Sequence, residues 1–381
     1  ENSVFHQIQK HVPWGLFDRL VQEHKADHRV RTLSTKSQFL ALLFAQLSGA
    51  SSLREIEAGL SSHEARLYHV GARSVARTTL ADANARRPAA LYAELFAHLA
   101  KAANRRTRRH IRDAVHLLDA TRIAVSSLSG GWADMVSGQR AIKLHVAYDP
   151  HEDTPLSMVM TGQRTNDIGP AKAMPVEPGM TYVFDMAYYN FAWWADLDRA
   201  GCRFVTRLKT DTQLEAAIAQ PVCEGTTILS DRIGHLPERL AYARRNPFAD
   251  PLREIVVEIS TGRTIRLVTN DLDAPAEEIA DLYKQRWQIE LFFKWIKQNL
   301  KIRHFIGASE NAVRIQTYVA LIAYLVLRMA QACQTTIAQP LAFHRLVRLN
   351  LMHKRPITTL AKPEPPNHCD TRQMSLFQCQ I

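Results

Sequence analysis

The spacing of apolar residues divides the chain into a helical first part and a strand-rich second part. Up to about residue 110, apolar residues recur three and four positions apart, as they do on one face of a helix. The segments with this spacing are 3–12, 15–24, 35–49, 52–60 and 74–88, the last of which Pro88 ends. We therefore predict a helical domain over residues 1–110.

Short apolar runs bounded by turn residues begin at Val115 and predict strands. Five strands are expected at 114–125, 142–150, 156–162, 180–189 and 202–209, with helical or connecting segments at 168–174 and 190–201. Strands interleaved with helices predict an α/β or α+β sheet domain, and its first part is placed at residues 111–210.

Residues 211–272 have a third pattern, in which strands follow one another without helices. Strands are expected at 226–233, 239–246, 253–260 and 263–270, and Thr261-Gly262 is a hairpin cue between the last two. Helical spacing returns over 274–300 and 312–332. These patterns predict a β-rich insertion at 211–272, a resumed sheet domain at 273–332, and a C-terminal helical segment and tail at 333–381.

The composition is that of a globular protein with a polyanionic partner. Of 381 residues, 46% are hydrophobic and 22% charged, and the net charge is +11. Lysine and arginine that neutralise phosphates gain affinity by releasing counterions, so nucleic acid is favoured over an anionic membrane. The longest apolar runs, 39–47 and 318–327, are too short to span a bilayer, and no signal peptide opens the sequence. We expect a soluble intracellular protein without a membrane partner.

Several chemistries lack their usual sequence signatures. The five cysteines are scattered without a C-x-x-C pair, which indicates neither a disulfide framework nor a zinc site. No H-E-x-x-H, phosphate-binding P-loop, G-x-G-x-x-G or G-x-S-x-G motif is present. Zinc hydrolysis, P-loop nucleotide use, dinucleotide binding and α/β-hydrolase catalysis are therefore disfavoured.

Two basic regions are candidates for contact with DNA. Six basic residues and no acidic one lie between Lys101 and Arg112, which predicts a phosphate-contacting linker or, alternatively, a solvated helix end; its candidates are Arg105, Arg106, Arg108 and Arg109. The segments 52–60, capped by Ser52, and 74–88 are compatible with a helix-turn-helix. Its arginines either read DNA or form a solvated basic face; they are Arg73, Arg77, Arg86 and Arg87.

The segment 283–300 predicts a helix with charged residues between apolar ones. Tyr283, Arg286, Glu290 and Lys297 fall within one narrow arc of that helix, flanked by apolar side chains on both sides. A surface helix with ion pairs such as Arg286 with Glu290 explains any one of these charges. A partly buried site explains all of them together.

Two aspartates stand where apolar strands end, Asp119 in "VHLLDAT" and Asp185 in "YVFDMAYYN". Singly, each is more typical of a turn or a helix cap than of a catalyst. If Asp119, Asp185 and Glu290 converge, they repel one another unless a cation lies between them. Mg²⁺ takes carboxylate oxygens and keeps positions for phosphate oxygens, so the three residues predict metal-dependent phosphodiester chemistry.

With these motifs the sequence resembles the DDE transposases of bacterial insertion sequences. The resemblance is to the insertion-sequence-4 subgroup, whose third acidic residue lies in a Y-(2)-R-(3)-E-(6)-K signature, matched here by Tyr283, Arg286, Glu290 and Lys297. "LLDAT", "FDMAYYN", "RLK" and "LKIRHFIGASENAV" occur in the family's order. The resemblance implies an RNase H-like catalytic core interrupted by the β-rich insertion and preceded by a helical DNA-binding domain.

The resemblance also implies residue roles and partners. Asp119, Asp185 and Glu290 would be the catalytic and metal-binding residues, for Mg²⁺ or Mn²⁺ in its place, and DNA-binding residues would be Tyr283, Arg286, Lys297, Arg207 and Lys209. The expected partner is double-stranded DNA, both terminal inverted repeats and target. A homodimer would pair two ends in the cytoplasm of a bacterium, associated with the nucleoid.

One departure from the family concerns a hairpin step. A tryptophan in the insertion of well-studied relatives stacks on a flipped base, whereas residues 211–272 contain only Tyr242 and Phe248 as aromatic rings. Cut-and-paste transposition is expected, with the hairpin route open. Two alternatives stay open as well: a structure-selective metal-dependent nuclease, and an inactive protein that binds element ends as a repressor.

Overall fold

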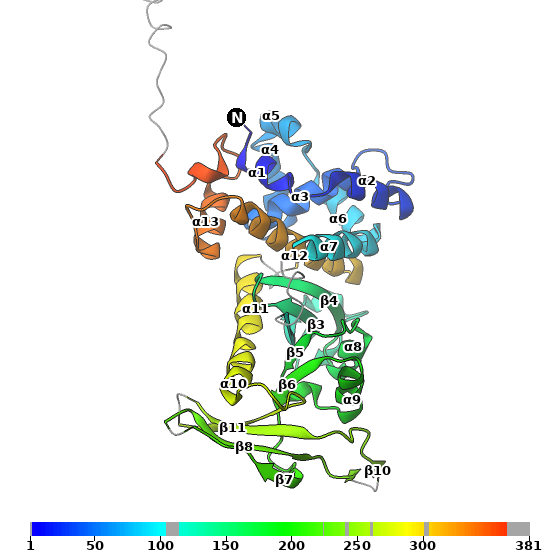
Figure 1. Ribbon diagram of the computed structural model, residues 1–381. Coiled ribbons are helices and arrows are strands. Elements are labelled where there is room, and N and C mark those ends of the chain that lie inside the picture. Colours follow the sequence, from blue (N-terminus) through cyan, green and yellow to red (C-terminus); the bar gives the residue numbers. More distant parts are fainter. Residues whose placement is uncertain are drawn as a thin grey trace, which may run out of the picture.

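The computed structural model describes residues 2–103, 114–223, 225–240, 244–259, 262–300 and 305–363. A layer of helices forms one end of the molecule, a mixed sheet flanked by helices forms the middle, and the β-rich strands form the opposite end (Figure 1). The predicted linker arginines Arg105, Arg106, Arg108 and Arg109, and most of the predicted tail, lie outside the described residues.

The expected N-terminal helices are present. They are α1 (Val4–Gln9), α2 (Trp14–Glu23), α3 (Thr35–Ser48), α4 (Leu53–Ser61), α5 (Glu64–Leu67), η1 (Tyr68–Val70), α6 (Arg77–Arg86) and α7 (Ala89–Ala103). The predicted cap is confirmed, since the Ser52 hydroxyl accepts a hydrogen bond from the Glu55 N–H at 3.2 Å.

The helix-turn-helix expectation is wrong in its connection. Between α4 and α6 the chain forms α5 and η1, so no tight turn joins the two helices. Arg87 is 7% exposed, and its guanidinium donates to Gln38 and to the Leu33 carbonyl. An arginine fixed in the core in this way cannot read DNA.

The C-terminal helices complete the helical layer. In α12 (Glu310–Ala332) the chain returns to pack against α3, α6 and α7, and α13 (Pro340–Asn350) contacts α3 and α12. By length and mean hydropathy alone α12 could cross a membrane, contrary to the expectation from the apolar runs, but 78% of its apolar window is buried inside the protein. This burial makes α12 the central helix of the helical layer.

The middle of the molecule has the topology expected of an RNase H-like core. Three antiparallel strands, β1 (Val115–Ala124), β3 (Gln139–Asp149) and β4 (Thr154–Gly162), are followed by β5 (Thr181–Phe184) and β6 (Arg203–Arg207). The order is β4-β3-β1-β5-β6, with β5 parallel to both β1 and β6, and β2 (Met135–Val136) pairs with the start of β3.

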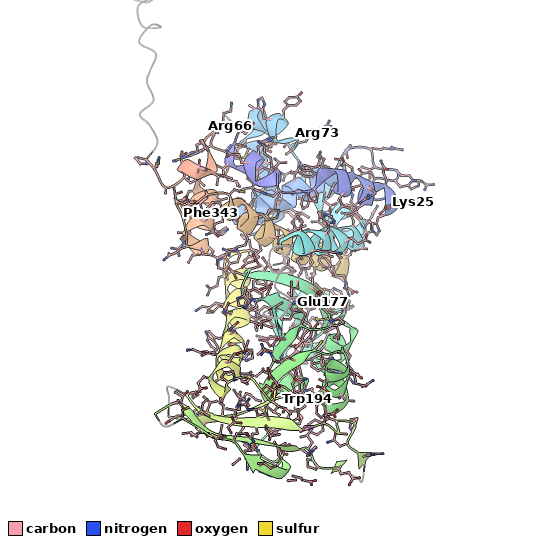
Figure 2. All side chains as sticks on the ribbon, in the orientation of Figure 1. Lys25, Arg66, Arg73, Glu177, Trp194 and Phe343 are labelled. Atoms are coloured by element: carbon pink, nitrogen blue, oxygen red, sulfur yellow. The ribbon has the colours of Figure 1, made fainter. Side chains whose placement is uncertain are left out.

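Helices cover both faces of this sheet. On one face lie α8 (Ile168–Ala173), η5 (Met186–Tyr188) and α9 (Phe191–Arg199), around a core in which Figure 2 marks the fully buried Trp194. On the other face lie α10 (Ala276–Gln285) and α11 (Trp287–Asn299), whose core joins that of the helical layer. The short η4 (Ser127–Ser129) follows β1, and η7 (Ile357–Thr359) follows α13.

The β-rich strands extend the same sheet. β12 (Thr264–Thr269) pairs with β6, and β11 (Leu252–Glu258), β8 (Ile228–His235) and β7 (Glu215–Ala219) follow in order, all antiparallel. The segment predicted as one strand at 239–246 forms two short strands instead, β9 (Arg239–Leu240) and β10 (Arg244–Arg245). β11 and β12 form the expected hairpin, although Thr261 lies outside the described residues.

The continuous helix expected over 283–300 is interrupted at Arg286. The Arg286 N–H donates to the Tyr283 carbonyl at 3.1 Å, and the Ile289 N–H donates to the Arg286 carbonyl at 3.3 Å. These contacts span three residues instead of four, so the helix tightens for one turn between α10 and α11. The tight turn lies beside the carboxylates described next.

Candidate active site

Asp119 and Asp185 are neighbours at one edge of the parallel strands. In the register of β1 and β5, Leu118 pairs with Phe184; Asp119 follows Leu118 within β1, and Asp185 comes directly after β5 ends. Asp119 was expected at the end of its strand, whereas β1 continues to Ala124. Adjacent strands lie about 5 Å apart, so the two carboxylates emerge side by side. The Asp185 carboxylate also accepts a hydrogen bond from the Ala187 N–H at 2.8 Å, which fixes it at the start of η5.

Glu290 faces these aspartates from the first turn of α11. One guanidinium nitrogen of Arg286 lies 2.7 Å from the Glu290 carboxylate, and the other lies 3.8 Å from the Asp119 carboxylate. The Arg286 side chain is 17% exposed. A single positive charge therefore connects the helix and the strand that carry two of the predicted acidic residues.

The electrostatics of Asp119 show that the carboxylates act on one another. The pKa of Asp119 is raised to about 7: burial and the charges of Asp185 and Glu290 raise it, whereas the Ala120 N–H and Arg286 lower it. The arginine thus compensates only part of the negative charge that folding gathers here.

The predicted DNA-binding residues lie on different sides of these carboxylates. Tyr283 and Arg286 line a cavity of about 810 Å³ between α10 and the β11–β12 hairpin, together with Arg207 from the end of β6. Lys297, three turns further along α11, donates a hydrogen bond to the hydroxyl of Thr121, two residues after Asp119 on β1. Lys209 lies instead over the ring of Tyr189, 4.5 Å from its centre, on the face of the sheet that α9 covers.

Sequence reasoning missed Trp287. It lines the cavity directly after Arg286 and its side chain is 58% exposed, which is unusual for tryptophan. Phe248, which the sequence offered as a stacking ring, is 3% exposed and cannot stack on a base, and Tyr242 lies outside the described residues. The sequence feature that could have indicated Trp287 is its position among the apolar residues that flank the charged arc of the helix.

The donor set suits a hard divalent cation. Three carboxylates with oxygen donors, one of them largely buried and carrying a raised pKa, are chemically suited to Mg²⁺. Within the described ranges, no group of three or more His, Cys, Asp or Glu side chains lies close enough to hold a metal ion. The guanidinium of Arg286 stands between Asp119 and Glu290, so a cation would be held only after this contact rearranges.

Two family models match the chain. Residues 112–326 match the model described as a transposase DDE domain, and this range includes every residue of the candidate site. Residues 1–73 match a domain of unknown function, DUF4372, which covers α1 to η1.

Similar proteins have been named as transposases. "Putative transposase y4zB" of Sinorhizobium fredii is 40% identical over 306 residues, 78% of this chain and 85% of that protein. "Probable transposase for insertion sequence element IS5377" of Geobacillus stearothermophilus is 31% identical over 238 residues, 61% of this chain and 62% of that protein. A solved piggyBac transposase synaptic complex with hairpin DNA aligns with 98% of this chain and 84% of its own, at 10% identity and a TM-score of 0.49, a likeness too distant to support an argument.

Proposed function

We propose, since this chain belongs to the DDE transposase family and is an insertion-sequence transposase, that Asp119, Asp185 and Glu290 are its metal-binding catalytic residues. The observation that carries the proposal is that the Arg286 guanidinium lies close to both Asp119 and Glu290. Asp185, directly after the neighbouring strand β5, lies beside Asp119. Carboxylates brought together at the cost of mutual repulsion indicate a site selected for chemistry rather than for stability.

The three carboxylates would hold Mg²⁺, with Mn²⁺ able to take its place. When bound, the ion supplies positive charge that activates the attacking oxygen and stabilises the leaving oxygen during displacement at phosphorus. Asp119 and Asp185 are fixed by adjacent strands, and Glu290 is positioned by α11. This arrangement gives two rigid ligands and one whose position depends on a helix.

The cationic side chains would hold the DNA strand against these carboxylates. Arg286, Arg207 and Tyr283 line one cavity, where they would bind phosphates of the transposon end. Lys297 adds positive charge on the β1 side. Without such cations, the approach of a phosphodiester to three carboxylates is electrostatically adverse.

The reaction would run in two displacements. In the first, a water oxygen forms a bond to the phosphorus at the element end and the 3′-oxygen leaves, taking a proton. In the second, that 3′-OH oxygen attacks a phosphorus of target DNA, and the target 3′-oxygen leaves with the proton released by the attacking hydroxyl. Each step exchanges one P–O bond for another.

The same proposal extends to the subgroup of the family, the oligomeric state and a hairpin step. The signature Tyr283, Arg286, Glu290 and Lys297 supports our proposal that the chain is a member of the insertion-sequence-4 subgroup. Two protomers would pair two terminal inverted repeats, as a homodimer that acts on nucleoid DNA in the cytoplasm. If a hairpin forms at the cut end, Trp287 is the exposed ring placed to stack on an unpaired base.

Cleavage and joining of labelled DNA that carries the element's own ends tests the proposal. Wild type in Mg²⁺ should cut and join, whereas Glu290→Gln should bind the ends and do neither. Glu310→Gln is the matched control, because Glu310 forms an ion pair of the same length and spacing with Arg314, at 2.7 Å on α12. Cleavage without joining by wild type would indicate a structure-selective nuclease, and binding without cleavage by both proteins would indicate an end-binding repressor.

A further inference from the structure

Besides the cavity lined by Arg286 and Arg207, a second cavity with cationic side chains lies on the opposite face of the sheet from α11, and we call it the hollow. Its volume is about 480 Å³, and the residues that matter here are Arg122, Lys143, Gln163, Arg164, Asp167 and Ala187. The Y-(2)-R-(3)-E-(6)-K signature includes none of them.

Strand register places this hollow behind the carboxylates. Arg122 of β1 pairs with Lys143 of β3, and the Lys143 ammonium contacts Asp167, just before α8. Thr121 points the other way, to Lys297 on α11, because successive side chains of a strand alternate between faces. Arg122 and Asp119 are three residues apart on β1, about 10 Å, and they face opposite sides of the sheet.

The hollow reaches the carboxylates around the end of β5. Ala187 lines it, and the N–H of the same residue donates to Asp185 at 2.8 Å. A strand of DNA seated in the hollow would therefore pass directly beside the residue that fixes one candidate metal ligand.

The charges in the hollow are of two kinds. Lys143 and Asp167 form a pair at 2.8 Å, with side chains 13% and 18% exposed, and they neutralise each other in the floor. Arg122 and Arg164 are exposed at the rim, so two positive charges have no neutralising carboxylate among the lining residues.

The rim that carries Arg164 is held in place by hydrogen bonds. The Gln163 amide donates to the carbonyls of Asp134 and Gln139 at 2.8 and 3.0 Å, and the Arg164 guanidinium donates to the Met135 carbonyl at 3.1 Å. The Asp134 carboxylate accepts from the Arg164 backbone N–H at 3.5 Å. These contacts orient Arg164 before any ligand binds.

We infer that this hollow binds backbone phosphates of target DNA through Arg122 and Arg164. The inference rests on the proposed function, in which one set of carboxylates must meet two DNA strands. The cavity lined by Tyr283, Arg286 and Arg207 accounts for one strand, on the α11 face. The second strand needs positive charge on the other side of Asp119 and Asp185, and the hollow supplies it with groups suited to phosphate.

The double variant Arg122→Ala/Arg164→Ala separates target binding from end cleavage. Cleavage at the element's ends should stay at the wild-type level, whereas joining of precleaved ends to a target plasmid should fall at least 10-fold. Arg199→Ala, an exposed arginine of α9 on the same face, is the matched control and should leave both steps unchanged. Arg122→Lys/Arg164→Lys should restore most of the joining, because the contact is to phosphate charge.

Binding to a duplex without transposon ends gives a readout independent of catalysis. Loss of two phosphate contacts should make the slope of log K against log salt concentration shallower by about 1.8. Equal loss of cleavage and joining, or loss of cleavage alone with normal joining of precleaved ends, would overturn the assignment in favour of element-end or flanking DNA.

Unchanged joining together with an unchanged salt slope would overturn the inference altogether. A wild type that neither cuts nor joins its own ends would refute the proposed function, and the salt slope would still decide whether the hollow binds DNA.

Discussion

The guanidinium of Arg286 lies 2.7 Å from the carboxylate of Glu290, across the tight turn that opens α11. Its other nitrogen reaches toward Asp119 at 3.8 Å, so the arginine is an internal counter-charge for carboxylates on a helix and on a strand. Its position explains how the fold tolerates this acidic group without a metal ion. A metal ion must therefore compete with Arg286 for the carboxylate oxygens, and DNA phosphates must compete with these carboxylates for the guanidinium.

Arg286→Gln should lower the stability of the metal-free protein by roughly 2 kcal/mol, since it leaves two partly buried carboxylates without their counter-charge. Added Mg²⁺ should then raise the unfolding temperature more than it does in wild type. Thermal unfolding with and without Mg²⁺ checks this. The control Arg314→Gln removes an equally short but more exposed pair with Glu310. Equal effects of the two substitutions would contradict the special position of Arg286.

Asp119→Asn should abolish cleavage and yet stabilise the metal-free fold by roughly 2 kcal/mol. The reason is that burial and two neighbouring carboxylates disfavour the charged form, as the raised pKa of Asp119 shows. Denaturant unfolding at neutral pH in EDTA measures the change. Asp196→Asn, on the exposed surface of α9, should change stability by no more than about 0.5 kcal/mol. A less stable Asp119→Asn protein would refute this account.

His344 makes the stability of the helical layer dependent on pH. Neither ring nitrogen has a hydrogen-bond partner among the described residues, and burial, with Arg348 and Arg345 nearby, lowers its pKa to about 4. Between pH 6.5 and 4 the unfolded chain binds a proton that the folded chain does not. Stability is therefore lost as pH falls through this window, by up to about 1.4 kcal/mol per pH unit.

His344→Leu should remove this part of the pH dependence and raise the unfolding temperature at pH 5. Unfolding scans from pH 4 to 7 measure it. The buried His145, whose pKa is lowered to about 4 mainly by burial, keeps a second contribution in the variant. The exposed His69→Leu serves as control, and a variant whose pH profile matches that of wild type would count against the argument.

Glu254→Gln should destabilise the β-rich end of the sheet by about 3 kcal/mol. Glu254 is fully buried between Arg232 at 2.7 Å and Arg266 at 2.5 Å, so its neutralisation leaves two arginines without their anion. Arg266 also donates to the carbonyls of Lys209 and Thr212, which attach these strands to the end of β6. Denaturant unfolding, with the exposed Glu258→Gln on the same strand as control, tests the expectation.

Trp287→Ala should leave the first cut at the element end intact and lower formation of any hairpin product by roughly 10-fold. Stacking of one base on an aromatic ring contributes about 1–3 kcal/mol, and the exposed ring contributes little to the fold. Gel analysis of the cleavage products measures both steps. Leu291→Ala, one turn further along α11 and 50% exposed, is the matched control. Equal behaviour of the two variants would exclude base stacking.

Local patterns made much of the architecture predictable. The strand at Val115–Ala124, the cap at Ser52 and the helix at Glu310–Ala332 each follow from spacing or residue type within one segment. Asp185 ends an apolar strand as the sequence predicts, whereas Asp119 lies in the middle of β1, so its place beside Asp185 depends on how β1 and β5 pair. The prediction of one continuous helix over 283–300 was wrong. The break at Arg286 leaves the 3.6-residue spacing of apolar residues almost unchanged, so the sequence pattern does not indicate it.

The sequence by itself determined the order of elements, the signature helix and the chemical class of the candidate site, because periodicity and residue type are properties of short segments. Only the tertiary structure decided that β12 joins β6, that α12 completes the N-terminal helical layer, and that Arg122 and Arg164 share a hollow behind the carboxylates. These relations depend on pairing and packing between residues far apart in the chain. Their energies arise only when the chain is folded, so no local pattern carries them.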